Sequence, residues 1–301
     1  MVSPLSPIGT SPWSLPSLSG PGPGPSPGES DFGPWFESLA ATLLNDRDLV
    51  VNGAVHRLAE VEVYYHGPRH ADPYAHRHPL QRESGRWYFH RTGTGGRYRG
   101  GSFQGLDLTL GDGSAYFGVL IRSVVTPEAR VIDGPSLVVD HLLRLTGAEG
   151  VAALDRRIAG RSVGASDSPV HLRPAARPRT ATVWSSPRVG LSLAQAIGSP
   201  QAARFVGRPY RFLTEPRAIR KGKPHLVLAL HGRGEKADAV ARVTGCQLRC
   251  VRRYIAAFEA GRATRGLSAF GHGGKGHTVE KRKPSVEELC RFLGAWAAEF
   301  G

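Results

Sequence analysis

The sequence predicts an α+β fold in residues 34–216 and a small helical domain in residues 234–301. From about residue 50 to residue 215, strand-like and helix-like runs follow one another without a regular βαβ alternation, which indicates a mixed domain. After residue 234 the apolar residues recur at helical spacing, as in Val251, Tyr254, Ile255 and Phe258. The chain of 301 residues is 40% hydrophobic, enough for one large or two ordinary cores.

The N-terminal segment is expected to be a disordered tail. Residues 1–33 consist largely of Pro, Ser and Gly and offer too little apolar surface to offset the entropy of ordering the chain. A helix is expected from about Pro34, because Phe36, Leu39, Leu43 and Leu44 lie at helical spacing.

Four further elements are predicted in residues 50–216. "HRLAEVEVYYH" (56–66) alternates like a strand. One face of it should carry Leu58, Glu60, Glu62 and Tyr64, and the other Ala59, Val61, Val63 and Tyr65. "SAYFGVLIRSVV" (114–125) is typical of a buried strand, and "GPSLVVDHLLRL" (134–145) of a helix with Pro135 in its first turn. "RPYRFLTE" (208–215) is predicted to be another strand.

The remaining segments predict a linker and a helical module. Residues 217–233 are basic and interrupted by Gly and Pro, which is typical of a connector. The next stretch predicts a short helix, a turn at Gly245 and a second helix, and resembles the helix-turn-helix of transposase-like and regulatory proteins. Its second helix, with Arg249, Arg252 and Arg253, would enter the DNA major groove; the alternative is a small helical bundle with a solvated arginine face. A basic Gly-rich arm (266–285) follows, and "SVEE" forms a capping box that starts a last helix at Ser285.

The charge balance favours a polyanionic partner. The formal net charge is +14 and the isoelectric point near 10.3, a recognised footprint of nucleic-acid binding, although a basic but otherwise ordinary protein is the alternative. We find no apolar run long enough to span a membrane and no signal-peptide pattern. The three cysteines are odd in number and predict an intracellular, reducing compartment. Cys246 and Cys250 have no second pair that would complete a metal site, so small core residues are favoured.

Four segments of the mixed domain resemble, in order, motifs of the alkyladenine (3-methyladenine) DNA glycosylase family. "EVEVYYHGPRHADPYAH" is similar to its E-T-E-A-Y…H segment, "GVLIRSVVTP" to its L-L-R-A-L-E-P strand and "DGPSLVVDHLL" to its G-P-S/G-K-L helix. "PRVGLSLAQAIGSPQAARFVGRPYRFLT" is similar to its closing P-R-V-G-I…R-P-L-R-F segment. The resemblance covers about residues 50–215. It implies a curved antiparallel sheet and hydrolysis of the glycosidic bond of alkylated or deaminated purines, without a cofactor or metal.

The resemblance also implies roles for single residues. Glu62 matches the general base that activates water, and Arg122 and the Val189 carbonyl match the groups that hold this water. Tyr64 matches the aromatic that stacks on the flipped base, and His76 the histidine that contacts it. His70 or His78 are alternatives to His76, because the gap after Glu62 is three residues longer than the family shows. Without the resemblance, Glu62 would be a strand glutamate paired with a basic residue, Tyr64 a core residue and Arg122 a structural arginine.

One region departs from the family. Phe103 or Gln104 falls where the family has a tyrosine that wedges into the duplex, and the asparagine that helps to select the lesion is missing. Trp87, Tyr88 or Tyr98 could stack on a base. Arginines suited to phosphate contacts are Arg86, Arg91, Arg97 and Arg99, and Arg208 of the closing segment joins them. A zinc site among His66, His70, Asp72, His76 and His78 is disfavoured by their irregular spacing.

The expected function is a monofunctional DNA repair glycosylase for alkylation-type or deamination damage, acting on duplex or single-stranded DNA by base flipping. A non-catalytic DNA-binding or regulatory protein on the same scaffold is the alternative, and a glycosylase for another base or for RNA is a third. The oligomeric state is left open.

Overall fold

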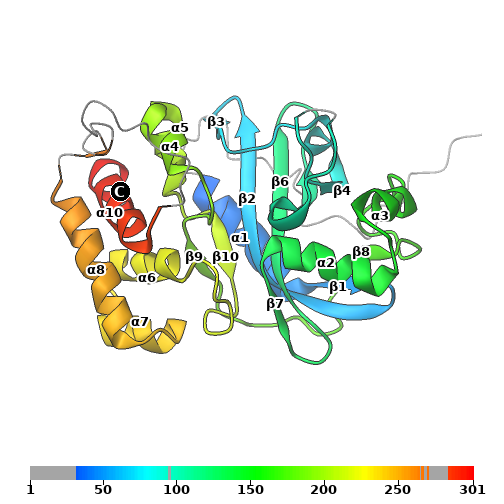
Figure 1. Ribbon diagram of the computed structural model, residues 1–301. Helices are drawn as coiled ribbons and strands as arrows, with labels where there is room; N and C mark the ends of the chain where they lie inside the picture. Colours follow the sequence, from blue (N-terminus) through cyan, green and yellow to red (C-terminus); the bar gives the residue numbers. More distant parts are fainter. Residues whose placement is uncertain (1–31, 94–95, 265, 268–269, 271–283) are drawn as a thin grey trace, which may run out of the picture.

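A single antiparallel sheet forms the centre of the protein, with helices gathered at one end and along its faces (Figure 1). The computed structural model describes residues 32–93, 96–264, 266–267, 270 and 284–301. The strands are β1 (Arg47–Val51), β2 (Ala54–Gly67), β3 (His70–Ala71), β4 (Ser84–Phe89), β5 (Leu106–Leu110), β6 (Tyr116–Val125), β7 (Val131–Asp133), β8 (Val170–Pro174), β9 (Trp184–Ser186) and β10 (Arg211–Leu213).

The helices are α1 (Phe32–Asp46), α2 (Pro135–Thr146), α3 (Val151–Ile158), α4 (Leu193–Gly198), α5 (Pro200–Val206), α6 (Lys223–Gly232), α7 (Ala237–Thr244), α8 (Leu248–Arg262) and α10 (Val286–Phe300). Two short 3₁₀ helices are η2 (Pro79–Arg82) and η3 (Gly101–Phe103).

The sheet has the order β4-β5-β6-β2-β1-β8, and the long strands β2 and β6 lie at its middle. The short strand β3 pairs with the end of β2 and β7 with the end of β6, β10 pairs with the middle of β2, and β9 pairs with β10. Figure 1 shows β2 bending along its length, so that the sheet curls. The predicted α+β fold with a curved antiparallel sheet is therefore confirmed, as are the predicted strands and the helix that begins at Pro135.

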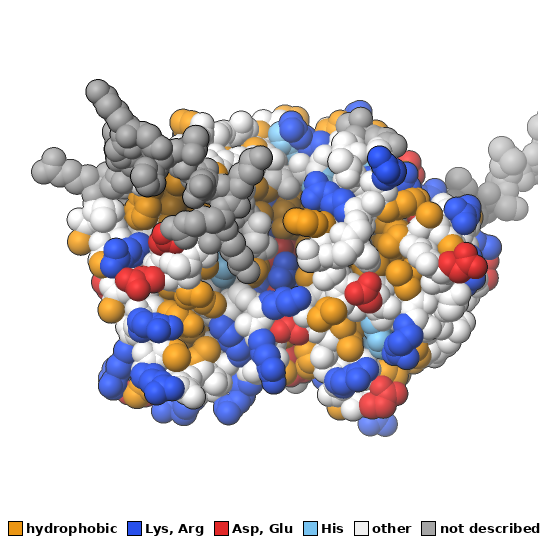
Figure 2. All heavy atoms as spheres, viewed as in Figure 1, with side chains coloured by type: hydrophobic (Ala, Val, Ile, Leu, Met, Phe, Trp, Pro, Cys, Tyr) orange, Lys and Arg blue, Asp and Glu red, His pale blue; other side chains and the backbone are white. Residues whose placement is uncertain are grey.

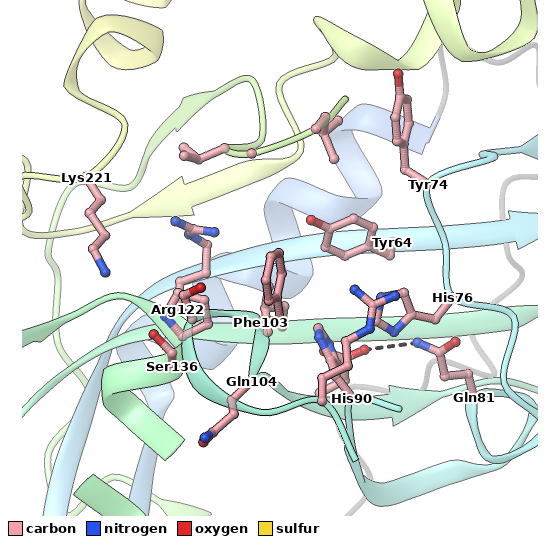
Figure 3. A pocket seen from close by; sticks show the side chains of 18 residues that line it. Tyr64, Tyr74, His76, Gln81, His90, Phe103, Gln104, Arg122, Ser136 and Lys221 are labelled. Carbon is pink, nitrogen blue, oxygen red and sulfur yellow. Dashed lines mark hydrogen bonds and ion pairs between the residues drawn. The ribbon is translucent and has the colours of Figure 1, made fainter. Parts of the chain in front are cut away.

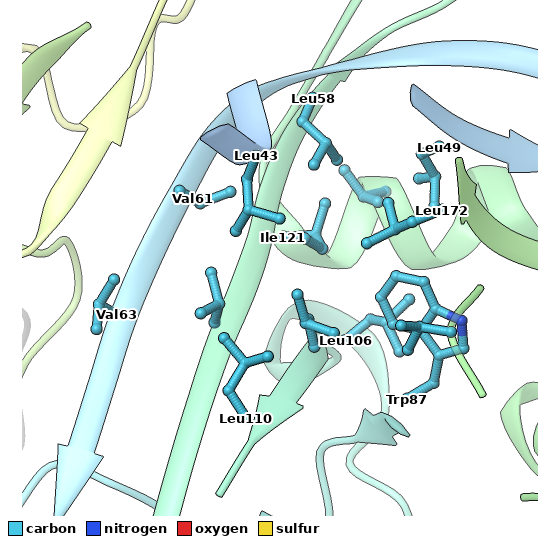
Figure 4. Packing of buried hydrophobic residues seen from close by; sticks show 14 of the residues in the cluster. Leu43, Leu49, Leu58, Val61, Val63, Trp87, Leu106, Leu110, Ile121 and Leu172 are labelled. Atoms are coloured by element: carbon cyan, nitrogen blue, oxygen red, sulfur yellow. The ribbon is translucent and has the colours of Figure 1, made fainter. Parts of the chain in front are cut away.

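The main core lies between α1 and the sheet. Phe36, Leu39 and Leu43 of α1 are buried in the same cluster as Val61 and Ile121 of the two central strands, and Figure 4 shows part of this packing. Helix α1 begins at Phe32, two residues before the expected start and inside the segment expected to be a tail. The rest of that expected tail, residues 1–31, lies outside the described residues.

An irregularity in the β2–β6 pairing corrects the predicted face assignment. Leu58 pairs with Val124 and Glu60 with Ser123, so Ala59 is an extra residue without a partner on β6. Such a bulge breaks the two-residue period of the strand. Leu58 therefore lies in the main core, whereas Ala59 contributes to a second cluster with α6. The assignment of Leu58 to the face of Glu62 and Tyr64 was wrong for this reason.

The predicted linker at residues 217–233 is also wrong over most of its length. Residues 223–232 form α6, whose Leu226, Val227 and Leu230 are buried with Ala59 and Leu213 of the sheet. The basic residues and Gly222 surround an apolar helix that is too short to show a clear periodicity. The C-terminal helices are therefore packed directly on the mixed domain.

Lys223 ties the turn between α7 and α8 to the mixed domain. Its ammonium group donates hydrogen bonds to the carbonyls of Pro216 (2.5 Å), Arg217 (3.1 Å) and Thr244. Burial lowers the pKa of Lys223, and the three carbonyls satisfy its three donors. Gly245 adopts the left-handed conformation (φ 69°) that ends α7, as expected for the predicted turn.

The last helix crosses α8 at close range. A Cβ atom at Gly294 would lie 1.9 Å from the Phe258 carbonyl, and one at Gly261 1.9 Å from the Arg291 carbonyl. The capping box at Ser285 is present, as predicted. The Gly-rich arm lies almost entirely outside the described residues. Cys290 is buried, and Cys246 and Cys250 are half-buried free thiols. Among the described helices none has the length and apolar character that crossing a membrane requires.

Two buried histidines join β2 to α2. The Nε2 atoms of His56 and His141 lie 2.9 Å apart, His56 Nδ1 contacts the Ala54 carbonyl, and Arg144 donates to His141 Nδ1. These contacts require His141 Nε2–H to donate to a neutral His56. Burial lowers the pKa of both rings, to about 4 for His141, and His141 also feels the positive charge of Arg144.

This pair is expected to make the folded protein less stable in acid. As the pH falls below 6.5, the unfolded histidines take up protons while the folded pair stays neutral until its lowered pKa values are reached. Stability should fall from pH 6.5 towards about 4, by at most about 1.4 kcal/mol per pH unit for each proton. Glu128, near both rings, opposes this loss, and Arg130 near His141 adds to it.

Urea unfolding of wild type and His141→Gln at about pH 7.5 and about pH 5 measures the effect. The variant should lose less stability than wild type between the two conditions, because only one ring of the pair can then be protonated. Equal losses in the two proteins would contradict the assignment, since other histidines titrate alike in both.

Candidate functional site

A cavity of about 560 Å³ opens beside the middle of β2 and β6. Figure 3 shows side chains that point into it from β2, β6, the loops of the sheet and the start of α2. Figure 2 shows a hollow near the centre of this face, with Lys and Arg side chains beside and below it. The lining residues are Tyr64, Tyr74, His76, Gln81, His90, Arg99, Ser102, Phe103, Gln104, Asp107, Leu120, Arg122, Pro135, Ser136, Val189, Gly190, Leu191 and Lys221. Seven of the residues predicted from the sequence are among them.

Glu62 lies directly behind the lining. Its side chain has no exposed surface, and three lining residues surround it. Val189 N–H donates to Oε1 (2.7 Å), the Tyr64 hydroxyl donates to Oε2 (2.8 Å), and Arg122 Nη1 lies 3.3 Å from Oε2. The contact of Val189 with Glu62 is thus made by its amide, whereas the resemblance assigned a role to its carbonyl.

Glu60 occupies a separate ionic cluster. Its Oε1 accepts from Arg211 Nε (2.5 Å) and Arg122 Nε (3.0 Å), and its Oε2 accepts from Ser123. Burial pushes the pKa of Glu60 upward, but the charges of Arg211 and Arg122 outweigh it, and the net shift is downward. Neither glutamate lines the cavity, but Glu60 contacts one lining residue, Arg122, whereas Glu62 contacts three. Of the two glutamates, Glu62 is therefore the one that adjoins the cavity.

Tyr64 separates Glu62 from a second buried ion pair. The Arg188 guanidinium lies 4.5 Å from the centre of the Tyr64 ring and 2.5 Å from Asp72 Oδ2. Burial, followed by the charge of Glu62, raises the pKa of Tyr64 far above its usual value. The phenol is therefore protonated at neutral pH and remains a donor to Glu62.

The histidine-rich loop after β2 has one member in the cavity. His76 lines it, and its Nδ1 lies 3.5 Å from the Tyr88 hydroxyl. His70 is buried against Tyr210, and His78 caps η2 and stacks on Tyr88. Burial, and then the nearby His90, lowers the pKa of His76 to about 4, so its ring is neutral at pH 7.

The residues of that loop do not converge on a metal-binding arrangement. Asp72 pairs with Arg188, and His66 contacts the Asp72 carbonyl. No cluster of three or more His, Cys, Asp or Glu suited to a metal ion occurs in the part of the chain that the structure describes.

Sequence reasoning missed a polar wall on the β5 side of the cavity. Asp107 is buried there, and its carboxylate accepts from His90 Nε2 (2.7 Å) and Gln81 Nε2 (2.9 Å). The pattern "LDLTL" contained the signal: Leu106, Leu108 and Leu110 alternate into the core, which leaves Asp107 on the opposite face. Gly118 on the neighbouring strand leaves room for this carboxylate.

Phe103 projects at the mouth of the cavity. It ends η3, it is 70% exposed, and it lines the cavity together with Gln104 and Arg99. This exposed ring is available to a ligand in the cavity.

The other arginines expected to bind DNA lie outside the lining. Arg97 is exposed, and half-buried Arg208 donates to the Arg204 carbonyl. Arg249, Arg252 and Arg253 are exposed on α8, opposite the buried Val251 and Phe258. Figure 2 shows Lys and Arg side chains over the C-terminal helices on the face that also carries the hollow.

Comparison with known proteins finds a viral relative of the chain. No family model matches the chain. The chain is 33% identical over 215 residues to an uncharacterized protein of Acanthamoeba polyphaga mimivirus, across 64% of this chain and 91% of the viral protein. The chain belongs to the same family as this viral protein. The match covers nearly all of the viral protein, whereas roughly a third of this chain lies outside it.

Proposed function

We propose that the protein is a DNA glycosylase that flips out a damaged purine and hydrolyses its N-glycosidic bond. The observation that carries this proposal is the position of Glu62, which adjoins a cavity of about 560 Å³ through Tyr64, Arg122 and Val189. A carboxylate at this place can activate water and stabilise the positive charge that develops on the sugar.

The base would bind between the aromatic residues of the cavity. Tyr64 offers a ring, and Arg188 covers one of its sides. Neutral His76 and the wall of Gln81, His90 and Asp107 offer hydrogen bonds to the edge of the base. Phe103 at the mouth would fill the gap that the flipped nucleotide leaves in the stack.

In the proposed reaction, Glu62 accepts a proton from water while the water oxygen attacks C1′. The C1′–N bond breaks, and its electron pair leaves with the base. A base that is positively charged through alkylation needs no further proton to leave. Arg122 Nη1 forms an ion pair with Glu62, and the Val189 amide orients the Glu62 side chain.

Base release from oligonucleotides tests the proposal. Wild-type protein is incubated with single- and double-stranded DNA that contains hypoxanthine, ethenoadenine or an alkylated purine. Release of at least one of these bases supports a glycosylase. Binding of the same DNA without release of any base would sink the enzymatic proposal.

That second outcome describes the alternative function, a non-catalytic DNA-binding protein. One observation favours it: Glu62 Oε1 already accepts from Val189 N–H and Oε2 from Tyr64. A water must therefore use the remaining lone pairs of the carboxylate or displace the tyrosine hydroxyl.

The arginines of α8 are expected to bind phosphate groups. Replacing Arg249, Arg252 and Arg253 together with alanine should weaken DNA binding and reduce the slope of log affinity against log salt by about two to three, since each phosphate contact contributes about 0.9. Fluorescence anisotropy over a salt series measures both quantities.

The matched control replaces Arg156 and Arg157, exposed on α3 at the far end of the molecule in Figure 1. This variant should keep the wild-type slope. An unchanged slope in the α8 variant would favour the helical bundle with a solvated arginine face.

A further inference from the structure

Lys221 brings a primary amine to the end of the cavity opposite the base-binding wall. It lines the cavity together with Ser136 and Arg122. Figure 3 shows its side chain pointing towards these two residues, with His76, His90 and Gln81 on the other side of Phe103. Among the described residues, no group forms a hydrogen bond or ion pair with its Nζ atom. The cavity therefore holds an uncommitted amine as well as the carboxylate behind it.

The main chain of Lys221 is held firmly. Its N–H donates to Asp133 Oδ2 (3.1 Å), and its carbonyl accepts from Arg211 Nη2 (2.9 Å). Arg211 in turn donates to Glu60, which also binds Arg122. The lysine is thus connected to the ionic cluster beside Glu62 through consecutive hydrogen bonds.

The side chain of Lys221 crosses Gly134, next to the strand that carries Arg122. A Cβ atom at Gly134 would lie 2.3 Å from Lys221 Nζ, so the amine passes directly over this glycine. The Gly134 N–H donates to the Arg122 carbonyl (2.9 Å), and Arg122 Nη1 contacts Glu62. The amine therefore lies on the side of the cavity that holds Arg122 and Glu62.

The choice of lysine is not explained by composition. The chain contains 39 basic residues, of which only six are lysines. Of the three lysines in the described residues, Lys223 is bound to carbonyls and Lys236 lies exposed before α7. An arginine at position 221 would supply the same charge for a phosphate, but it could not form a Schiff base.

We propose that Lys221 gives this site a second activity, cleavage of the DNA strand at an abasic site. This activity rests on the proposed function, whose product is an abasic sugar with an aldehyde at C1′. The Lys221 amine, after giving its ammonium proton to water, adds to C1′. The carbonyl oxygen takes up that proton and one from the nitrogen and leaves as water, which produces a protonated imine. The C2′ proton passes to water, and its electron pair forms the C2′–C3′ double bond as the C3′–O bond breaks. The 3′ phosphate leaves, and water then hydrolyses the imine to regenerate Lys221.

Borohydride trapping on preformed abasic DNA tests this activity without a need for base release. Hydride adds to C1′ of the imine and leaves a stable bond between protein and DNA, which is seen as a shifted band in a denaturing gel. Wild-type protein should form the adduct and cut the strand. Lys221→Arg, measured at saturating protein, should lower both at least tenfold.

Lys236→Ala is the control for exposed amines that react non-specifically with abasic DNA. It should form as much adduct as the wild-type protein. Peptide mapping of the adduct should identify Lys221. An absent wild-type adduct would overturn the lyase activity, and equal adduct formation by Lys221→Arg would overturn the role proposed for Lys221. Because the abasic DNA is supplied, neither outcome bears on the glycosylase, which stands or falls with the base-release assay.

Discussion

Replacing Glu62 with glutamine is expected to reduce base release by about 10²- to 10⁴-fold, the usual contribution of a positioned general base. Glutamine has the shape of glutamate, and its amide oxygen can still accept from the Val189 N–H. It cannot take a proton from water, and it provides no negative charge beside the developing cation. DNA affinity should change less than twofold, because Glu62 has no exposed surface. Single-turnover base release and anisotropy titrations measure the two effects.

Glu60→Gln is the matched control, because it makes the same substitution in a neighbouring, fully buried glutamate of β2. It removes the carboxylate that binds Arg122 and Arg211, so it should lower stability without removing the catalytic base. Full base release by Glu62→Gln would show that Glu62 is not the base. If Glu62→Gln loses base release and circular dichroism shows that it is also unfolded, Glu62→Asp replaces it as the test. Glu62→Asp keeps the negative charge but shortens the side chain.

Replacing Arg188 with leucine is expected to destabilise the protein by about 3–5 kcal/mol, because it leaves the Asp72 carboxylate buried without its partner. Arg188 has almost no exposed surface, donates to the Val63 carbonyl (3.0 Å) and lies over the Tyr64 ring. The substitution therefore also removes support from the wall of the cavity. Equilibrium unfolding in urea measures the loss.

A double substitution separates the ion pair from the packing. Asp72→Asn combined with Arg188→Leu should recover part of the lost stability, because the unpaired charge is then gone. Arg291→Met, which breaks the exposed pair with Glu287, should cost less than about 1 kcal/mol. An Arg188→Leu effect as small as that of Arg291→Met would show that the buried pair contributes little.

The local elements could be predicted because their signals lie within a few residues. Alternation in "EVEVYY" placed Glu62 and Tyr64 on one face of a strand, and the structure joins them by a hydrogen bond. Pro135, Gly245 and the capping box at Ser285 marked helix ends through backbone conformation and local hydrogen bonds. The ordered motifs predicted that segments 50–125 and 187–191 share a site, and residues of both segments line the cavity.

Other features depended on pairing between distant segments. The bulge at Ala59 arises from the register of β2 against β6, which no pattern within β2 reveals. Helix α6 was hidden because it is buried on several sides and therefore shows no apolar stripe. The wall of Asp107, Gln81 and His90 forms only where β5 and η2 meet.

The sequence by itself determined the fold class and most helix and strand positions, because periodicity and capping are local properties of the chain. Glu62 became the candidate base only through the resemblance to the alkyladenine glycosylase family. The tertiary structure alone decided which histidine of the loop enters the cavity, that Asp72 pairs with Arg188, and that Lys221 lies beside Arg122. These depend on how a curled sheet brings together residues more than 80 positions apart, such as Lys221 and Asp133. A charged group that becomes buried must be paired with an opposite charge, whereas one that faces the cavity can bind a ligand instead.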